Sequence, residues 1–241
     1  HTWRNDRPRE QYQRVGRFRV ACICGGAMMK DDLRLPKEAL VNKFVAKTRF
    51  YEKTRLSSKL QKEFVDKIKR ITWKYKLADS TIGIAKTDTV AEIQVFEIEL
   101  KEQKIPKNVL KIIDKIIPYQ ILYRFVHEEN VAYGISLKDG GSVGNYYFSD
   151  WNADMRFDFS GIDLGLVYQK LVKAFLRDEA KDKDDFNDIV STDQKIRTME
   201  TEIASLESKI QKEKQFNRKV EMHSTLLKKK ALLADITGGL E

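Results

Sequence analysis

Cysteine is nearly missing from this chain of 241 residues. The two cysteines, Cys22 and Cys24, both stand in the first 27 residues. A disulfide framework is therefore excluded for the rest of the chain, and a reducing cytoplasm is the compartment that we expect. A lone C-x-C without a second pair of ligands does not complete a zinc site, so we predict no metal centre.

Histidine and long hydrophobic runs are scarce as well. After His1 only His127 and His223 remain, one beside a predicted hairpin turn and the other on a predicted helix. Neither a Ser/His/Asp nor a Cys/His arrangement has credible members. No apolar run approaches the ~20 residues that a helix needs to cross a bilayer, which predicts no transmembrane segment and no membrane partner.

The first 27 residues differ from the remainder in their cations. They contain six Arg and no Lys, whereas the remainder contains nine Arg and 30 Lys. We interpret residues 1–27 as a non-native or disordered extension, with native coding beginning at Met28 or Met29. An Arg-rich targeting or nucleic-acid arm is the rival interpretation. Without this stretch, 39 basic and 34 acidic residues remain, and the net charge falls from +9 to +5.

Glycine and proline are absent from residues 193–234, where apolar side chains recur every three or four residues. This spacing is the a/d seam of a coiled coil, which predicts a helix that buries the seam against a partner. We therefore predict a coiled-coil helix over residues 193–236 that binds a protein partner or a second copy. The predicted interaction seam is Ile196, Met199, Ile203, Leu206, Ile210, Val220 and Leu227.

Polar residues interrupt this seam near its middle. Glu213 falls at a d position, and Asn217 and Ser224 fall at a positions. Because no Gly or Pro breaks the run, we favour one continuous helix. The alternative is a break between Glu213 and Asn217, where the helix folds back as a hairpin.

The segments before the seam predict a mixture of helices and strands. Their order indicates an α/β (α+β) fold, a mixed sheet with flanking helices plus the long C-terminal coiled-coil helix. We assign residues 28–177 to this α/β domain and residues 178–192, which are rich in acids, to a solvated linker. We predict helices over residues 57–77, 106–117 and 163–176, and strands over residues 81–85, 90–101, 119–127, 130–137, 143–151 and 155–159.

One strand carries a pattern that restriction-type nucleases use. Glu99-Leu100-Lys101 is an E-x-K before a predicted helix, and alternation places Glu97, Glu99 and Lys101 on one face. In such a site carboxylates hold Mg²⁺ and the lysine acts near the phosphate. A second strand must also supply an acid, and only Asp79 and Asp88 are near in sequence. A charged strand face is the simpler interpretation, so catalytic residues and cofactors are predicted to be absent, with Mg²⁺ required only under the nuclease alternative.

A basic stretch interleaved with aromatic residues suggests a further alternative. Cations beside aromatic rings suit contacts with nucleic acid. An ordinary solvated helix face explains the same residues, and a net charge of +5 is modest for a dedicated binder. The candidate nucleic-acid contacts are Lys67, Lys69, Arg70, Lys74 and Lys76.

Four stretches spread along the chain are LPK with LVNK within residues 35–43, EIQVFEIELK at 92–101, IIPY at 116–119 and EKQFNRKVE at 213–221. Together they resemble a prokaryotic family catalogued as a domain of unknown function, number 4391. The resemblance implies genes near DNA methyltransferases and helicases of restriction or phage-defence type, and it implies no assigned activity. We therefore expect a non-enzymatic accessory protein that docks through its coiled coil, with methyltransferase or helicase subunits as candidate partners.

Overall fold

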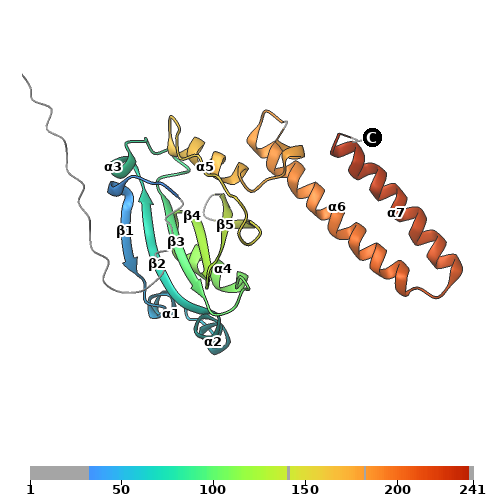
Figure 1. Ribbon diagram of the computed structural model, residues 1–241, viewed down its shortest axis with the longest axis horizontal. Helices are drawn as coiled ribbons and strands as arrows, with labels where there is room; N and C mark the ends of the chain where they lie inside the picture. Colours follow the sequence, from blue (N-terminus) through green and yellow to red (C-terminus); the bar gives the residue numbers. More distant parts are fainter. Residues whose placement is uncertain (1–32, 140–141, 182, 239–241) are drawn as a thin grey trace, which may run out of the picture. The chain divides into compact units, whose positions relative to one another are not determined.

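The computed structural model describes residues 33–139, 142–181 and 183–238, so the predicted extension over residues 1–27 lies outside it. Its centre is one six-stranded sheet in which strand order follows chain order (Figure 1). Only β3 and β4 are parallel, and every other neighbouring pair is antiparallel. The strands are β1 (Leu40–Phe44), β2 (Ile68–Leu77), β3 (Ile93–Leu100), β4 (Gln120–His127), β5 (Asn130–Asp139) and β6 (Ser142–Phe148).

Helices flank this sheet and follow it in the sequence. The crossover between the parallel strands is made by α4, as parallel pairing requires. The predicted fold class, a mixed sheet with flanking helices and long C-terminal helices, is confirmed. The helices are α1 (Thr48–Lys53), α2 (Ser58–Lys67), α3 (Asp79–Ile82), α4 (Lys107–Ile116), α5 (Leu164–Lys173), α6 (Phe186–Lys212) and α7 (Phe216–Ile236), with short 3-10 turns η1 (Lys37–Ala39) and η2 (Asp178–Ala180).

The sheet is covered on both faces, because successive residues of a strand point to opposite sides. In β4, Tyr123 and Phe125 pack in a cluster with residues of α1, α2 and α4. Leu122 packs in a second cluster with residues of α5 and the first turns of α6. Among the described helices, none is long and apolar enough to cross a membrane.

The helix predicted over residues 57–77 is wrong beyond Lys67. Ser57 caps α2 as its side chain accepts from the backbone N–H of Leu60, but residues 68–77 form β2 between β1 and β3. Irregularities in the pairing between Ile68 and Arg70 and between Trp73 and Tyr75 shift the alternation of the strand. Most buried residues of β2 therefore recur at steps of three and four, the spacing of a helix, and this spacing explains why a helix was predicted here.

Two short predicted strands are also wrong. Residues 81–85 form the end of α3 and a turn at Gly83, where φ is +67°, and only Ala85 makes an isolated bridge, to Asp163. Residues 155–159 have no strand pairing, yet Phe157 packs its ring on Tyr133 with centroids 4.9 Å apart. Both segments contain strand-like residues whose side chains are partly buried, although neither segment joins the sheet as a strand.

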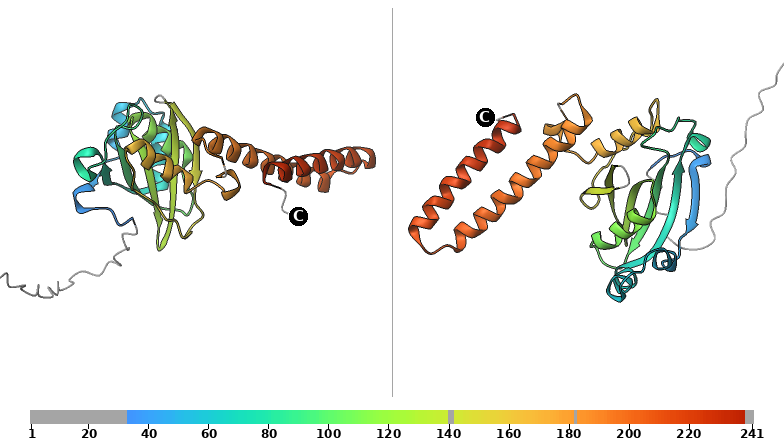
Figure 2. Two further views of the ribbon diagram at one scale, coloured as in Figure 1. Left: turned by 90° about the horizontal axis from the view of Figure 1, so that it is seen from above. Right: turned by 180° about the vertical axis from the view of Figure 1, so that it is seen from behind.

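The long C-terminal helix is broken, so the prediction of one continuous helix is wrong and the hairpin alternative is correct. Helices α6 and α7 lie side by side (Figure 2). The break needs no Gly or Pro, because the Glu213 carboxylate accepts from the backbone N–H groups of Lys214 and Gln215 at 2.8 and 2.9 Å. These backbone hydrogen bonds, led by that from Gln215, lower the pKa of Glu213. We call α6 and α7 together the C-terminal hairpin.

The acid-rich stretch over residues 178–192 is structured in part. Helix α6 begins at Phe186, seven residues before the predicted start, and its N-cap is Asp185. The Asp185 carboxylate accepts from the N–H groups of Asn187 and Asp188, an arrangement that stabilises a helix N-terminus. Ile189 is buried with the α5 cluster, so α6 is anchored to the domain from its first turns.

Candidate functional site

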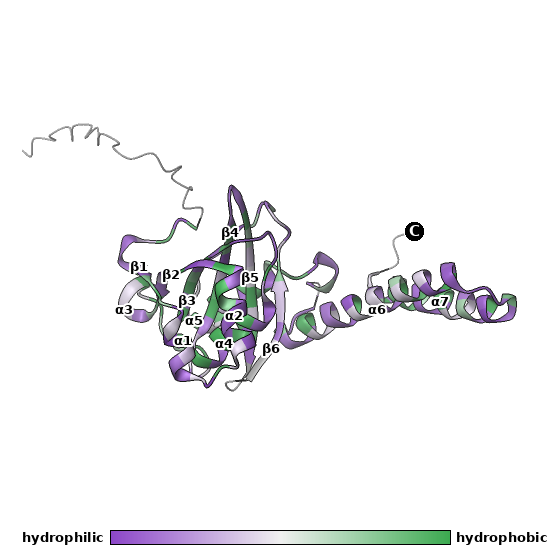
Figure 3. Cartoon of the chain, turned by 90° about the horizontal axis from the view of Figure 1, so that it is seen from below, coloured by the Kyte–Doolittle hydropathy of each residue, from purple (hydrophilic) through white to green (hydrophobic). Residues whose placement is uncertain are grey.

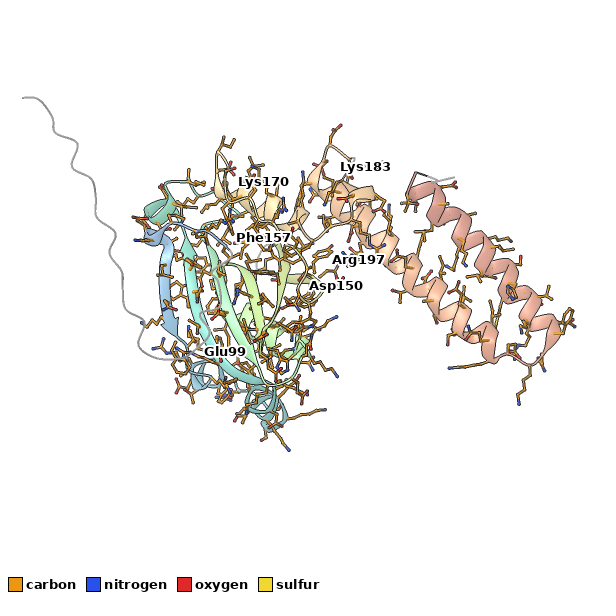
Figure 4. The ribbon with its side chains drawn as sticks, viewed as in Figure 1. Glu99, Asp150, Phe157, Lys170, Lys183 and Arg197 are labelled. Atoms are coloured by element: carbon orange, nitrogen blue, oxygen red, sulfur yellow. The ribbon has the colours of Figure 1, made fainter. Side chains whose placement is uncertain are left out.

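The E-x-K segment lies where the parallel strands β3 and β4 end. Alternation places Glu97 and Glu99 on the same face as Val95, as predicted, whereas Lys101 follows the last residue of β3. In the neighbouring strands, Glu97 pairs in register with Thr72 of β2 and with Arg124 of β4. Figure 4 labels Glu99 on the sheet.

Cations neutralise both glutamates. The nearly buried Arg124 donates from Nη1 to Oε2 of Glu97 at 2.9 Å, and Lys74 Nζ lies 3.4 Å from the same oxygen. Glu99 pairs with Lys69 at 3.3 Å. The carboxylates therefore join three neighbouring strands through ion pairs.

A two-carboxylate Mg²⁺ site does not fit these residues. The β2 residue opposite Glu99 is Arg70, which brings a positive charge where the chemistry needs an acid. Asp79 and Asp88 fall between β2 and β3, at the far end of β3 and about 20 Å along the strand from Glu99. Within the part of the chain that the structure describes, no group of three or more His, Cys, Asp or Glu side chains could hold a metal ion.

The candidate nucleic-acid contacts lie along β2 and the end of α2, and each has a local partner. Arg70 stacks its guanidinium over the Phe44 ring, 5.7 Å from the centroid. The hydrogen bond from Lys67 to Glu102 raises the pKa of Lys67 and lowers that of Glu102. The candidate lysines of β2 and of the end of α2 are therefore each paired with a glutamate. The lysine pairs are Lys67 with Glu102 at 2.7 Å, Lys69 with Glu99 at 3.3 Å, Lys74 with Glu97 at 3.4 Å and Lys76 with Glu92 at 2.7 Å.

A buried ion pair lies beneath the sheet, and sequence reasoning missed it. Lys138 Nζ is 3.0 Å from Oδ1 of Asp114, and the two side chains are 3% and 0% exposed. Lys138 also donates to the carbonyls of Ile117 and Tyr119 at 2.8 and 2.5 Å, so it caps the C-terminal end of α4. The Tyr146 hydroxyl donates to Oδ2 of Asp114 at 2.5 Å.

Burial changes the proton affinities of this buried pair and its neighbour. Desolvation lowers the pKa of Lys138, while Asp114 opposes that effect. Desolvation and then Asp114 raise the pKa of Tyr146 far above its usual value. Because the charged groups are enclosed and fully bonded to each other, the arrangement stabilises α4 on the sheet and offers no open reactive group.

The predicted seam is divided among three environments. Ile196 is buried in the α5 cluster of the domain. Ile203 and Ile210 are buried inside the hairpin, where Leu206 also packs, and Met199 is half-buried. Val220 and Leu227 are 51% and 66% exposed. The first five seam residues are thus at least partly covered within the chain.

The outer side of α7 carries an apolar stripe. Phe216 is 77% exposed and joins Val220 and Leu227, and small Ala231 and Ala234 continue the row. At 100° per residue these positions fall within about 60° of one another around the helix. The face that packs on α6 is separate, with Met222, Leu226 and Leu233. We call the five outer residues the α7 stripe; Figure 3 colours the helix by hydropathy.

A buried carboxylate fixes the base of the hairpin to the domain. Asp193 is fully buried and accepts from the backbone N–H of Arg177 at 3.1 Å and from Arg197 Nε at 2.5 Å. Arg197, labelled in Figure 4, also donates to the carbonyl of Phe175 and lies over the Tyr147 ring at 5.1 Å. These contacts hold α6 against α5 and β6.

The sequence matches the family described as Domain of unknown function (DUF4391) over residues 33–233. The chain belongs to this family. The DUF4391 match covers the sheet, the buried ion pair and most of the hairpin in one span. A comparison with curated proteins and with solved structures finds no match.

Two signals in this DUF4391 chain could have located the missed residues. Asp114 shares the buried face of α4 with Leu110 and Ile113, and a carboxylate on an apolar face requires a buried partner. Phe216 lies four residues before Val220, so it extends the seam toward the turn. The sequence could not show which side of α7 the rest of the hairpin would cover.

Proposed function

We propose that this DUF4391 protein is a non-enzymatic accessory protein that docks through its C-terminal hairpin. It works in the cytoplasm, without a cofactor, in a bacterial DNA restriction-modification or phage-defence type system. The observation that carries the docking role is the α7 stripe, whose Phe216, Val220 and Leu227 are each more than half exposed. The system to which it belongs rests on what the family resemblance implies.

The α7 stripe favours binding for an energetic reason. Burying a Val, Leu or Phe side chain stabilises a complex by about 1.5–3 kcal/mol relative to leaving it in water. Exposed apolar side chains that form one row on a helix are the pattern of a coiled-coil contact. The inner row is already used between α6 and α7, so the outer row is the part of the predicted seam that remains for a partner.

The docking role predicts which substitutions abolish capture of a partner. Full-length protein should co-purify with a methyltransferase or helicase subunit encoded beside it, and Val220→Asp with Leu227→Asp should remove that capture because charges would enter the contact. Leu232→Asp is the matched control, since Leu232 is also on α7 and 49% exposed but lies about 140° from Leu227. Equal capture by all three proteins would show that the hairpin does not dock the partner.

The accessory role and the nuclease alternative differ in whether the protein cleaves DNA. We expect purified protein with Mg²⁺ or Mn²⁺ to leave single- and double-stranded DNA intact, because Glu97 and Glu99 are paired with cations and Arg70 stands opposite Glu99. The measurement is a gel assay of labelled DNA. Cleavage that disappears in Glu99→Ala with Lys101→Ala would replace the accessory role with a nuclease role.

Nucleic-acid binding along β2 would need lysine side chains that can leave their carboxylate partners and contact phosphate. Lys69 is the most exposed of the paired β2 lysines, and its partner Glu99 is partly exposed beside it. A phosphate backbone would have to compete with this carboxylate and with Glu92, Glu97 and Glu102. The charges of β2 therefore favour the accessory role over a dedicated nucleic-acid contact.

A further inference from the structure

We propose that a second copy of this chain covers the α7 stripe. In this arrangement the two α7 helices pack antiparallel across a two-fold axis near Thr225, and the two hairpins together form a four-helix bundle. The inference rests on the proposed docking role of the hairpin, and it identifies a second copy of the chain as the molecule that binds the α7 stripe.

The sizes of the stripe residues favour an antiparallel pair. The row is wide at its start, with Phe216 and Val220, and narrow at its end, with Ala231 and Ala234. Antiparallel packing places Phe216 against Ala234 of the second copy and Val220 against Ala231 of the second copy. A parallel pair would set Phe216 on Phe216 and Ala234 on Ala234, which leaves a gap along half of the contact.

Leu227 fits the same register. The position opposite it in the second copy falls between His223 and Ser224, and the Ser224 side chain is smaller than a second leucine. An axis near Thr225 thus brings each large stripe residue to within about one position of a smaller one, along a helix about 31 Å long. A two-fold contact of this kind uses one patch twice, as isologous dimers do.

The charges beside the α7 stripe match in that register as well. Glu221 and Lys228 lie seven residues apart on one flank, and neither side chain forms an ion pair with another residue that the structure describes. In the antiparallel register Glu221 faces Lys228 of the second copy, and the symmetry repeats the pair. Lys229 and Lys230, by contrast, are already paired with Glu202 and Glu207 inside the hairpin.

Sedimentation velocity of the full chain over a concentration series tests the second copy directly. We expect a dimer, a dissociation constant raised about 100-fold or more by Leu227→Asp, and a change of no more than about threefold with Leu232→Asp. A wild-type chain that stays monomeric at about 100 μM overturns the inference. The proposed docking role would still stand in that case if Val220→Asp with Leu227→Asp removed capture of a methyltransferase or helicase subunit.

Charge reversal tests the register. Glu221→Lys alone and Lys228→Glu alone each place like charges together, so each should weaken the dimer about tenfold or more. Mixing these two variants should restore dimerisation, because the two chains then face each other with opposite charges. Circular dichroism checks that the exposed substitutions leave the helices folded. A mixture that dimerises no better than either variant alone overturns the antiparallel register.

Discussion

Replacing Lys138 with Met should lower the free energy of unfolding by about 3–5 kcal/mol, because it leaves the Asp114 carboxylate buried without its cation. It also removes the cap from the carbonyls of Ile117 and Tyr119 at the end of α4. Asp114 cannot turn to solvent, since its side chain is fully enclosed. Urea denaturation followed by circular dichroism measures the loss.

The control for this substitution is an exposed pair of the same type. Lys170 binds Asp158 at 2.7 Å, and both side chains are partly open to solvent. Lys170→Met should cost at most about 1 kcal/mol, as exposed ion pairs do. Lys138→Met combined with Asp114→Asn should recover part of the loss, because no unpaired charge then stays buried. Equal costs for Lys138→Met and Lys170→Met would refute the assigned role of the buried pair.

Replacing Asp193 with Ala should cost about 1–3 kcal/mol, because donors at the base of the hairpin lose their buried acceptor. The substitution leaves the N–H of Arg177 and the guanidinium of Arg197 without their buried acceptor. Hydrogen exchange should show lost protection in the first turns of α6, and thermal melting should show the overall loss.

Two variants separate this effect from a general loss of helix stability. Asp193→Asn keeps an acceptor oxygen for Arg177 but removes the charge, so we expect an intermediate cost. Glu202 lies on α6 like Asp193 and forms an exposed ion pair with Lys229 of α7. Glu202→Ala breaks that pair and should change the free energy of unfolding by less than about 1 kcal/mol. Unchanged exchange in α6 of Asp193→Ala would contradict the anchoring role of this carboxylate.

Sequence patterns predicted the elements whose periodicity is undisturbed. The apolar face of residues 106–117 became α4, and the strand-like runs on either side of Glu128-Glu129 became the β4–β5 hairpin. The same reasoning failed at β2, because its bulges shift alternation into steps of three and four. The decisive information there is the pairing with β1 and β3, which no local window contains.

In the candidate sites, too, the sequence predicted features that depend on neighbouring residues and missed those that depend on residues far along the chain. The shared face of Glu97 and Glu99 follows from alternation alone. Their partners Arg124 and Lys74 depend on which strands lie beside β3. The seam was predicted from its spacing, but the turn at Glu213 depends on a carboxylate that accepts from the N–H groups of the next two residues, a signal weaker than Gly or Pro.

The strand order has a consequence for how the chain acquires its structure. Each strand of the sheet after β1 pairs with the strand just before it in the sequence, so no strand waits for one further along the chain before it can pair. Each new strand can therefore pair as soon as it and the segment before it have emerged, which favours folding from the N-terminal side during synthesis. The hairpin follows the sheet in the sequence, so a ribosome exposes the α7 stripe only after every strand of the sheet has emerged.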